Sequence, residues 1–161
     1  MKNLTNLFII TSLFLAAVLL SSGCTDRETG QGAELLTVNS TSDIETLLEK
    51  GPVFIEIGAG WCPSCVEQKP IVEELASKYE DRMAFVYIDT EKQPQLSNYF
   101  GVYYIPDLTM IVSSDNGKFT YLTRLGTLTN DRQEAMMVGL TSKKVLEVTI
   151  QDALRLRSTQ S

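Results

Sequence analysis

Two cysteines separated by two residues lie where the sequence changes from a strand pattern to a helix pattern. The run 52–57 is apolar apart from one glutamate, residues 64–79 have helical spacing, and Cys62 and Cys65 fall at the junction. A helix N-terminus presents unpaired N–H groups and about half a positive charge, which stabilise a thiolate and lower the thiol pKa. We therefore expect Cys62 to act as a nucleophile and Cys65 to close a disulfide with it.

Pro63, between the two cysteines, supports a helix start at this point. Proline is favoured at the first helical position, because the N–H that it lacks would have no partner there. The sequence therefore predicts that the helix begins immediately after Cys62.

Composition limits the classes of protein that this chain can belong to. Its 161 residues allow one domain and a short appendage. The net charge of −6 argues against binding nucleic acid, because proteins that bind it carry a basic surface. The chain has no histidine, which excludes Ser-His-Asp catalysis, Cys-His catalysis and Cys/His zinc fingers.

The N-terminus has the features of a secretory signal. Lys2 precedes an apolar run at 7–20, which is short for a membrane-spanning helix and typical of a signal sequence. The sequence 20–24, Leu-Ser-Ser-Gly-Cys, resembles a prokaryotic lipobox, with Ser21 where leucine is usual. We expect residues 1–23 to be a lipoprotein signal peptide and Cys24 to be lipidated. An ordinary cleaved signal or an uncleaved anchor is the alternative.

Both interpretations place the domain outside the cytoplasm, where disulfides persist. The chain has three cysteines, so a lipidated Cys24 would leave Cys62 and Cys65 as a pair. A disulfide between them closes too small a loop to stabilise the fold much, so reactivity explains the pair better. Residues 24–33 are polar and contain two glycines, which predicts a flexible tether.

Strand and helix patterns alternate from residue 34 to about residue 100, and a hairpin follows. The expected strands are 34–38, 52–57, 83–88, 108–112 and 118–125. The expected helices are 42–50, 64–79, 94–100, 130–138 and 142–156, and a disordered tail is expected at 157–161. This order predicts an α/β domain over 34–156, with a mixed sheet of four to five strands flanked by helices.

Local signals fix several of these boundaries. Ser42 and Glu45 have the spacing of a capping box, and Gly51 should end that helix. Pro70 should bend the second helix. The Asn-Gly pair at 116–117 predicts an antiparallel hairpin. Asn130 and Ser142 are the expected caps of the last two helices.

Residues 35–156 resemble the thioredoxin-fold family. Residues 61–65, Trp-Cys-Pro-Ser-Cys, match its W-C-x-x-C active site, and Pro70 falls where the family has a kinking proline. Asp89 closes the third strand as in the family, and Ile105-Pro106 matches its cis-proline. Gly126 matches a glycine that follows the last strand. The resemblance implies the thioredoxin fold.

The resemblance also implies roles for individual residues. Cys62 would be the attacking thiolate and Cys65 the resolving thiol, with Trp61 as part of the substrate surface. A cis bond before Pro106 would expose the backbone of Ile105 as an edge to which a substrate peptide can add.

Glu56 interrupts an apolar strand, and a buried carboxylate is costly unless it is used or neutralised. The family carries an aspartate at this position that exchanges a proton with the second cysteine. We therefore expect Glu56 to be a general base with a raised pKa. The lysine that accompanies the buried acid in the family aligns with Phe85, so that cation is missing here.

These features predict a membrane-tethered, extracytoplasmic thiol–disulfide oxidoreductase that acts on protein disulfides without a cofactor. Cys-Pro-x-Cys also occurs in the membrane-anchored reductases of cytochrome c maturation, which favours a reductant. A reductant would need electrons from a membrane partner. The alternatives are an oxidant or isomerase, a copper(I) or other metal chaperone that uses the two thiolates, and a non-catalytic binding domain.

Overall fold

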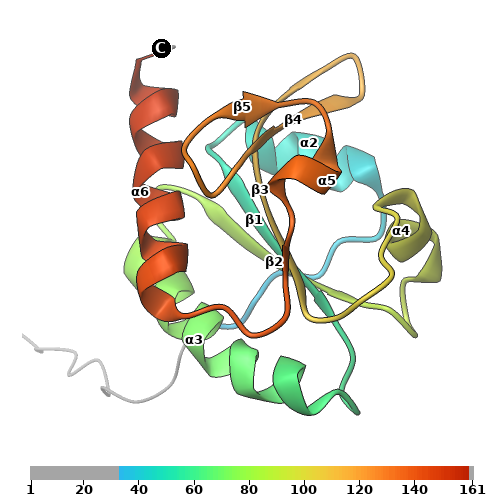
Figure 1. The fold of residues 1–161 in the computed structure, drawn as a ribbon. Coiled ribbons are helices and arrows are strands. Elements are labelled where there is room, and N and C mark those ends of the chain that lie inside the picture. Colours follow the sequence, from blue (N-terminus) through green and yellow to red (C-terminus); the bar gives the residue numbers. More distant parts are fainter. Residues whose placement is uncertain (1–32, 160–161) are drawn as a thin grey trace, which may run out of the picture. The chain divides into compact units, whose positions relative to one another are not determined.

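A computed structural model describes residues 33–159 of the chain (Figure 1). The predicted signal peptide 1–23, the predicted lipidation site Cys24 and nearly all of the predicted tether 24–33 lie outside the described residues. Within 33–159, no helix has the length and apolar character needed to cross a membrane.

The domain is built on one mixed sheet. Its strands are β1 (Val53–Gly58), β2 (Ala84–Asp89), β3 (Asp107–Asp115), β4 (Lys118–Leu122), β5 (Leu128–Thr129) and β6 (Met137–Val138). The strand order is β2-β1-β3-β4-β5, and β6 pairs with β3. β1 runs parallel to β2 and antiparallel to β3. The predicted mixed sheet is confirmed, and the two short strands β5 and β6 bring it to six strands.

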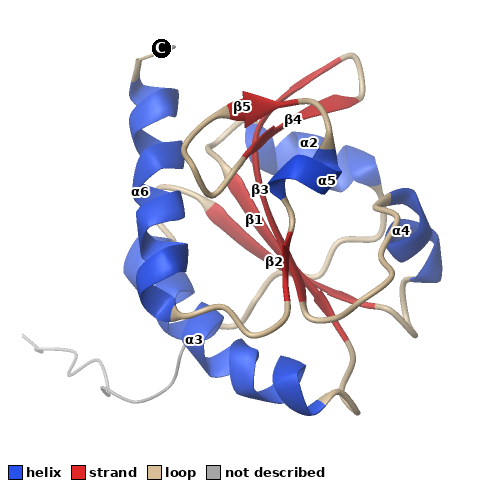
Figure 2. Cartoon of the chain, viewed as in Figure 1, coloured by secondary structure: helices blue, strands red, loops and turns tan. Residues whose placement is uncertain are grey.

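Helices cover both faces of the sheet. They are α2 (Thr41–Leu48), α3 (Pro63–Tyr79), α4 (Pro94–Tyr99), α5 (Arg132–Ala135) and α6 (Lys143–Ser158). α3 and α6 lie on one face, and α2 and α4 lie on the other (Figures 1 and 2). Two apolar cores result, one under α3 and α6 and one under α2 and α4. This arrangement is the expected α/β architecture.

β1 is the central strand that leads to the cysteines. All of its residues are buried, because strands flank it on both sides and helices cover both of its faces. Phe54 belongs to the core under α3, whereas Ile55 and Ile57 belong to the core under α2. Side chains alternate along a strand, so Glu56 and Gly58 lie on the α3 face.

The predicted hairpin is confirmed. Asn116 and Gly117 both have positive φ, at 50° and 80°, and they join β3 to β4 as an antiparallel pair. These are the backbone angles that make the Asn-Gly pair a strong turn signal.

The predicted strand 34–38 is reduced to a single bridge between Leu36 and Val86. Leu36 donates its N–H to the Phe85 carbonyl and accepts the Tyr87 N–H at its own carbonyl, so the pairing extends over one residue only. The chain then continues into α2. The Nε2 of the Gln93 side chain donates a hydrogen bond to the carbonyl of Val38. Because that side chain takes the place of a strand partner, the run of apolar residues does not become a full strand.

The predicted capping box of α2 is wrong by two residues. Ser40, not Ser42, is the N-cap, and its hydroxyl accepts the N–H of Asp43 at 3.2 Å. Asp43 returns the bond by accepting the N–H of Ser40 at 3.0 Å. Asp43 thus has the role in the capping box that the sequence predicted for Glu45. The Glu45 carboxylate instead accepts a hydrogen bond from the Ser114 hydroxyl.

The predicted helix 130–138 is also wrong. Asp131, not Asn130, caps α5, which has only four residues. The chain then forms β6, because its backbone finds partners in β3 at Asp107 and Leu108. Backbone pairing with β3 therefore determines the structure of this segment, against the helical pattern of its sequence.

The last helix begins after Ser142 as predicted but runs to Ser158, two residues beyond the expected end. Arg157 donates to the carbonyl of Leu48 at 3.0 Å, which ties the end of α6 to the end of α2. The predicted tail 157–161 therefore starts within a helix.

Candidate active site

Cys62 is the N-cap of α3, and Pro63 holds the first helical position, as predicted. The Cys62 Sγ accepts the backbone N–H of Cys65 at 3.2 Å. A tight turn precedes the helix, in which the N–H of Cys62 donates to the Ala59 carbonyl at 3.1 Å. The sulfur thus accepts a backbone N–H at the positive end of a 17-residue helix, and such a site lowers the pKa of a thiol.

Cys62 and Cys65 form a disulfide, with their Cα atoms 5.2 Å apart. The two residues are 6% and 3% exposed, whereas Trp61 beside them is 67% exposed. The pair therefore lies just beneath a surface that carries a large aromatic side chain.

The bond between Ile105 and Pro106 is cis, as expected from the sequence. The Cys62 Sγ lies 3.8 Å from the carbonyl oxygen of Ile105, although 43 residues separate the two in the sequence. The fold thus brings together five of the predicted site residues, namely Trp61, Cys62, Cys65, Ile105 and Pro106.

Gly139 fills the place that the family pattern gave to Gly126. Gly139 directly follows β6, and its N–H donates to the Pro106 carbonyl at 2.8 Å. Gly126 instead lies in the turn after β4, where its N–H donates to the Thr123 carbonyl. The sequence misplaced this glycine because β6, two residues long, carries no strand signal of its own.

Glu56 is fully buried on the α3 face of β1. Neither carboxylate oxygen has a hydrogen-bond partner among the described residues. Burial raises the pKa of Glu56 to about 8; Lys69 opposes this rise and Glu73 adds to it. The raised pKa agrees with the expectation from the sequence.

Sequence reasoning missed two residues beside the resolving cysteine. A Cβ atom on Gly58 would lie 3.1 Å from the Cys65 Sγ and 3.2 Å from the Tyr87 hydroxyl oxygen. Only glycine leaves this space open. Tyr87 is directly opposite Glu56 in the pairing of β1 with β2. Nothing in the local sequence marks Tyr87, because the proximity comes from the register of two strands.

A buried ion pair supports the cis-proline loop and was also missed. The Arg132 guanidinium donates to Asp107, which follows Pro106, and to the Phe100 carbonyl. Beside it lies a cavity of about 180 Å³, whose lining residues come from the loop before the cis bond, from the start of β3 and from the segment around β6. They are Gly101, Tyr103, Tyr104, Asp107, Met136 and Val138.

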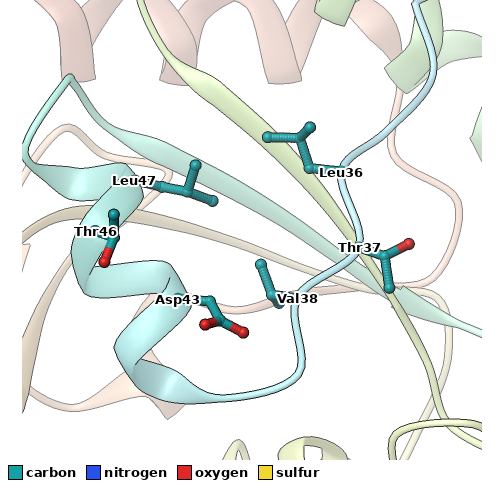
Figure 3. Close-up of a pocket in the computed structure, with 6 residues that line it drawn as sticks. All are labelled: Leu36, Thr37, Val38, Asp43, Thr46 and Leu47. Carbon is teal, nitrogen blue, oxygen red and sulfur yellow. The ribbon is translucent and has the colours of Figure 1, made fainter.

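A second cavity, of about 270 Å³, lies between the extended segment 36–38 and α2 (Figure 3). Asp43 and Thr46 line it together with apolar side chains, and none of the predicted site residues does so. It lies against α2, whereas Cys65 belongs to α3 on the other face of the sheet.

Metal-binding side chains do not gather in the described part of the chain. Residues 33–159 contain no group of three or more histidine, cysteine, aspartate or glutamate side chains placed to hold an ion. Cys24, the third cysteine, is outside these residues.

Thioredoxins are among the known proteins with sequences similar to this chain. The chain is 34% identical over 70 residues to "Thioredoxin 1" of Nostoc sp., covering 44% of this chain and 65% of that protein. It is 29% identical over 92 residues to "Thioredoxin M2, chloroplastic" of Arabidopsis thaliana, covering 57% of this chain and 49% of that protein. The chain thus spans less than two thirds of the length of each of these relatives.

Among solved structures, a mutant thioredoxin of Halobacterium salinarum aligns with a TM-score of 0.56 and 22% identity. The alignment covers 78% of this chain and 96% of that structure, which shows a shared fold. The Thioredoxin family model matches residues 34–146, well over half of the chain. The chain therefore belongs to the thioredoxin family.

Proposed function

We propose that this protein is a thiol–disulfide oxidoreductase that acts on protein disulfides. The observation that carries the proposal is the position of the Cys62–Cys65 disulfide at the N-terminus of α3, against the cis peptide bond at Pro106. The helix supplies a thiolate-stabilising end, and the cis-proline loop presents the Ile105 carbonyl 3.8 Å from the Cys62 sulfur, where a substrate peptide can pair with the backbone.

The reaction of the reduced protein begins with the Cys62 thiolate. It attacks one sulfur of a substrate disulfide, forms a mixed disulfide with it and releases the other substrate sulfur as a thiolate, which takes up a proton. The Cys65 N–H, which donates to the Cys62 sulfur, favours the thiolate before the attack.

Cys65 completes the reaction. Its thiol loses a proton and attacks the Cys62 sulfur, so the mixed disulfide breaks and the second substrate thiolate leaves. Two electrons pass to the substrate, and the protein is left with the Cys62–Cys65 disulfide. Glu56 is buried on the face of the sheet that α3 covers, and its pKa of about 8 is close to that of a free thiol, so in this proposal Glu56 is the group that would accept the Cys65 proton.

The substrate surface in this proposal surrounds the disulfide. Ile105 would pair through its backbone with an extended substrate peptide, and Pro106 would hold that backbone in place. Trp61, Tyr103 and Tyr104 are 67%, 84% and 74% exposed and offer apolar contact beside it. Main-chain pairing flanked by flat aromatic surfaces would accept many substrate sequences.

Tethering outside the cytoplasm is part of the proposal and is supported by the sequence of residues 1–24 alone. Growth with a radioactive fatty acid should label the wild-type protein, and Cys24→Ser should abolish the label and release the protein from membranes. A label retained by Cys24→Ser would refute lipidation at this residue, whereas unlabelled wild type in the membrane fraction would indicate an uncleaved anchor.

The direction of electron flow is tested by the reduction potential of the Cys62–Cys65 pair. The full-length protein is equilibrated with dithiothreitol buffers, and the disulfide is followed by the fluorescence of Trp61, the only tryptophan. A potential near about −270 mV, that of thioredoxin, would support a reductant supplied by a membrane partner. A value near about −120 mV would indicate an oxidant and overturn the proposed direction.

A further inference from the structure

We propose that Tyr87 assists the resolving step by donating a hydrogen bond from its hydroxyl to the Cys65 thiolate. This inference rests on the proposed function, because it assigns a role in the step in which Cys65 attacks the mixed disulfide. Tyr87 comes from β2, and Cys65 comes from the first turn of α3.

The hydroxyl of Tyr87 and the sulfur of Cys65 both lie close to Gly58. The position of a Cβ on this glycine would be 3.1 Å from the Cys65 Sγ and 3.2 Å from the Tyr87 hydroxyl oxygen. Both atoms therefore border the same small space at the end of β1. Glycine leaves that space empty, so a rotation of either side chain can bring the hydroxyl towards the sulfur once Cys65 is reduced.

The Tyr87 hydroxyl is available as a donor. Its side chain is half-buried against the core under α3, and the hydroxyl has no hydrogen-bond partner within residues 33–159. Burial, followed by the charges of Glu56 and Asp89, raises the pKa of Tyr87 to about 12. The hydroxyl thus keeps its proton over the whole range in which thiols titrate.

The charged groups that act on this site come from three elements, and the first is β1, whose Glu56 acts on Tyr87. Lys69 and Glu73 of α3 affect Glu56 in opposite directions, and Asp89 of β2 acts on Tyr87. The β3 residue opposite Glu56 is Leu108, which carries no charge. Among the described elements, Lys69 is therefore the only cation that acts on Glu56 or Tyr87. With so little positive charge at the site, a neutral hydrogen-bond donor has a larger part in stabilising the Cys65 thiolate.

The first test is Tyr87→Phe in the full-length protein, which removes the hydroxyl and keeps the ring. The pKa of Cys65 is measured in the reduced protein from the ¹³Cβ chemical shift. Losing a hydrogen bond to a charged sulfur should raise this pKa by about one unit. Resolution of a mixed disulfide at pH 7 should then slow about threefold. The higher pKa reduces the fraction of Cys65 present as thiolate, but it also makes that thiolate more nucleophilic, which offsets part of the loss.

Tyr121→Phe is the matched control. Tyr121 is buried, and its pKa is also about 12, but it lies in the core on the other face of the sheet. Tyr121→Phe should leave the Cys65 pKa unchanged. If removing any tyrosine hydroxyl from the interior disturbed the fold and so the Cys65 pKa, both variants would show the change.

A second pair of variants decides the matter if Tyr87→Phe does not fold. Gly58→Ala places a methyl group against both the sulfur and the hydroxyl and should raise the Cys65 pKa in the same way. Gly60→Ala, which has nothing within 4 Å of the added carbon, should not.

An unchanged Cys65 pKa in Tyr87→Phe or, if that variant does not fold, in Gly58→Ala would overturn the inference. The pKa measurement needs only the reduced protein, so it decides the inference whether or not the wild type reduces protein disulfides. A wild type that reduces none would overturn the proposed function instead.

Discussion

Arg132 donates a hydrogen bond from Nη2 to Oδ1 of Asp107 at 2.6 Å, and the two side chains are only 9% and 2% exposed. The same guanidinium donates to the Phe100 carbonyl at 2.7 Å. Burial raises the pKa of Asp107 even though Arg132 opposes the rise. Because Asp107 follows Pro106, this pair fastens α5 to the loop that borders the active-site disulfide.

Breaking this ion pair should be costly. Arg132→Met leaves Asp107 buried without its partner, and we expect the free energy of unfolding to fall by about 3–5 kcal/mol. Urea unfolding of the oxidised protein measures the loss. Arg155→Met is the control, because Arg155 pairs with Asp152 but is 73% exposed, and it should cost no more than about 1 kcal/mol.

Replacing both partners tests whether the loss of stability comes from the unpaired charge of Asp107. Arg132→Met combined with Asp107→Leu removes the stranded charge and should recover most of the stability that the single substitution loses. A double variant that is less stable than Arg132→Met alone would contradict this account of the pair.

Glu56 should make the stability of the protein fall as pH rises. Its pKa is about 8 in the folded protein against an ordinary value of 4.5, so the folded state favours the protonated acid. The resulting stabilisation is complete below about pH 4.5 and is lost as pH rises through 8. The loss should approach about 1.4 kcal/mol per pH unit within this window.

Glu56→Gln removes this titration and should have a flatter pH dependence between about pH 5 and pH 9. The comparison uses urea unfolding of both oxidised proteins at several pH values. Parallel profiles for wild type and variant would mean that Glu56 ionises in the folded protein as it does in water.

The start of α2 gives a local test. Ser40→Ala removes the hydroxyl that accepts the Asp43 N–H, and it should lower the free energy of unfolding by about 1 kcal/mol. Ser42→Ala should change it by less than about 0.5 kcal/mol, because Ser42 is exposed and is not the cap. The reverse order of effects would restore the capping box expected from the sequence.

The elements near the cysteines could be predicted from the sequence because local chemistry determines them. The apolar run predicted β1, and Pro63 predicted the start of α3 after Cys62. The Asn-Gly pair at 116–117 predicted the hairpin. The cis bond before Pro106 was expected from the family motif rather than from any local preference.

The errors occurred where tertiary contacts decide. β6 forms because its backbone pairs with β3 beside the cis-proline, and a two-residue strand leaves no periodic pattern. Tyr87 and Cys65 both approach Gly58 only because β1 and β2 pair in one particular register. The Arg132–Asp107 pair joins residues that are 25 positions apart, and neither residue type signals burial.

The most direct test of the central claim is to trap the mixed disulfide. Full-length Cys65→Ser is mixed with a protein that contains disulfides, such as insulin, and the adduct is identified by non-reducing electrophoresis and mass spectrometry. We predict an adduct through Cys62 that persists, because the resolving thiol is absent, and no adduct for Cys62→Ser. Adducts formed equally well by both variants, or by neither, would contradict the assignment of Cys62 as nucleophile and Cys65 as resolving thiol.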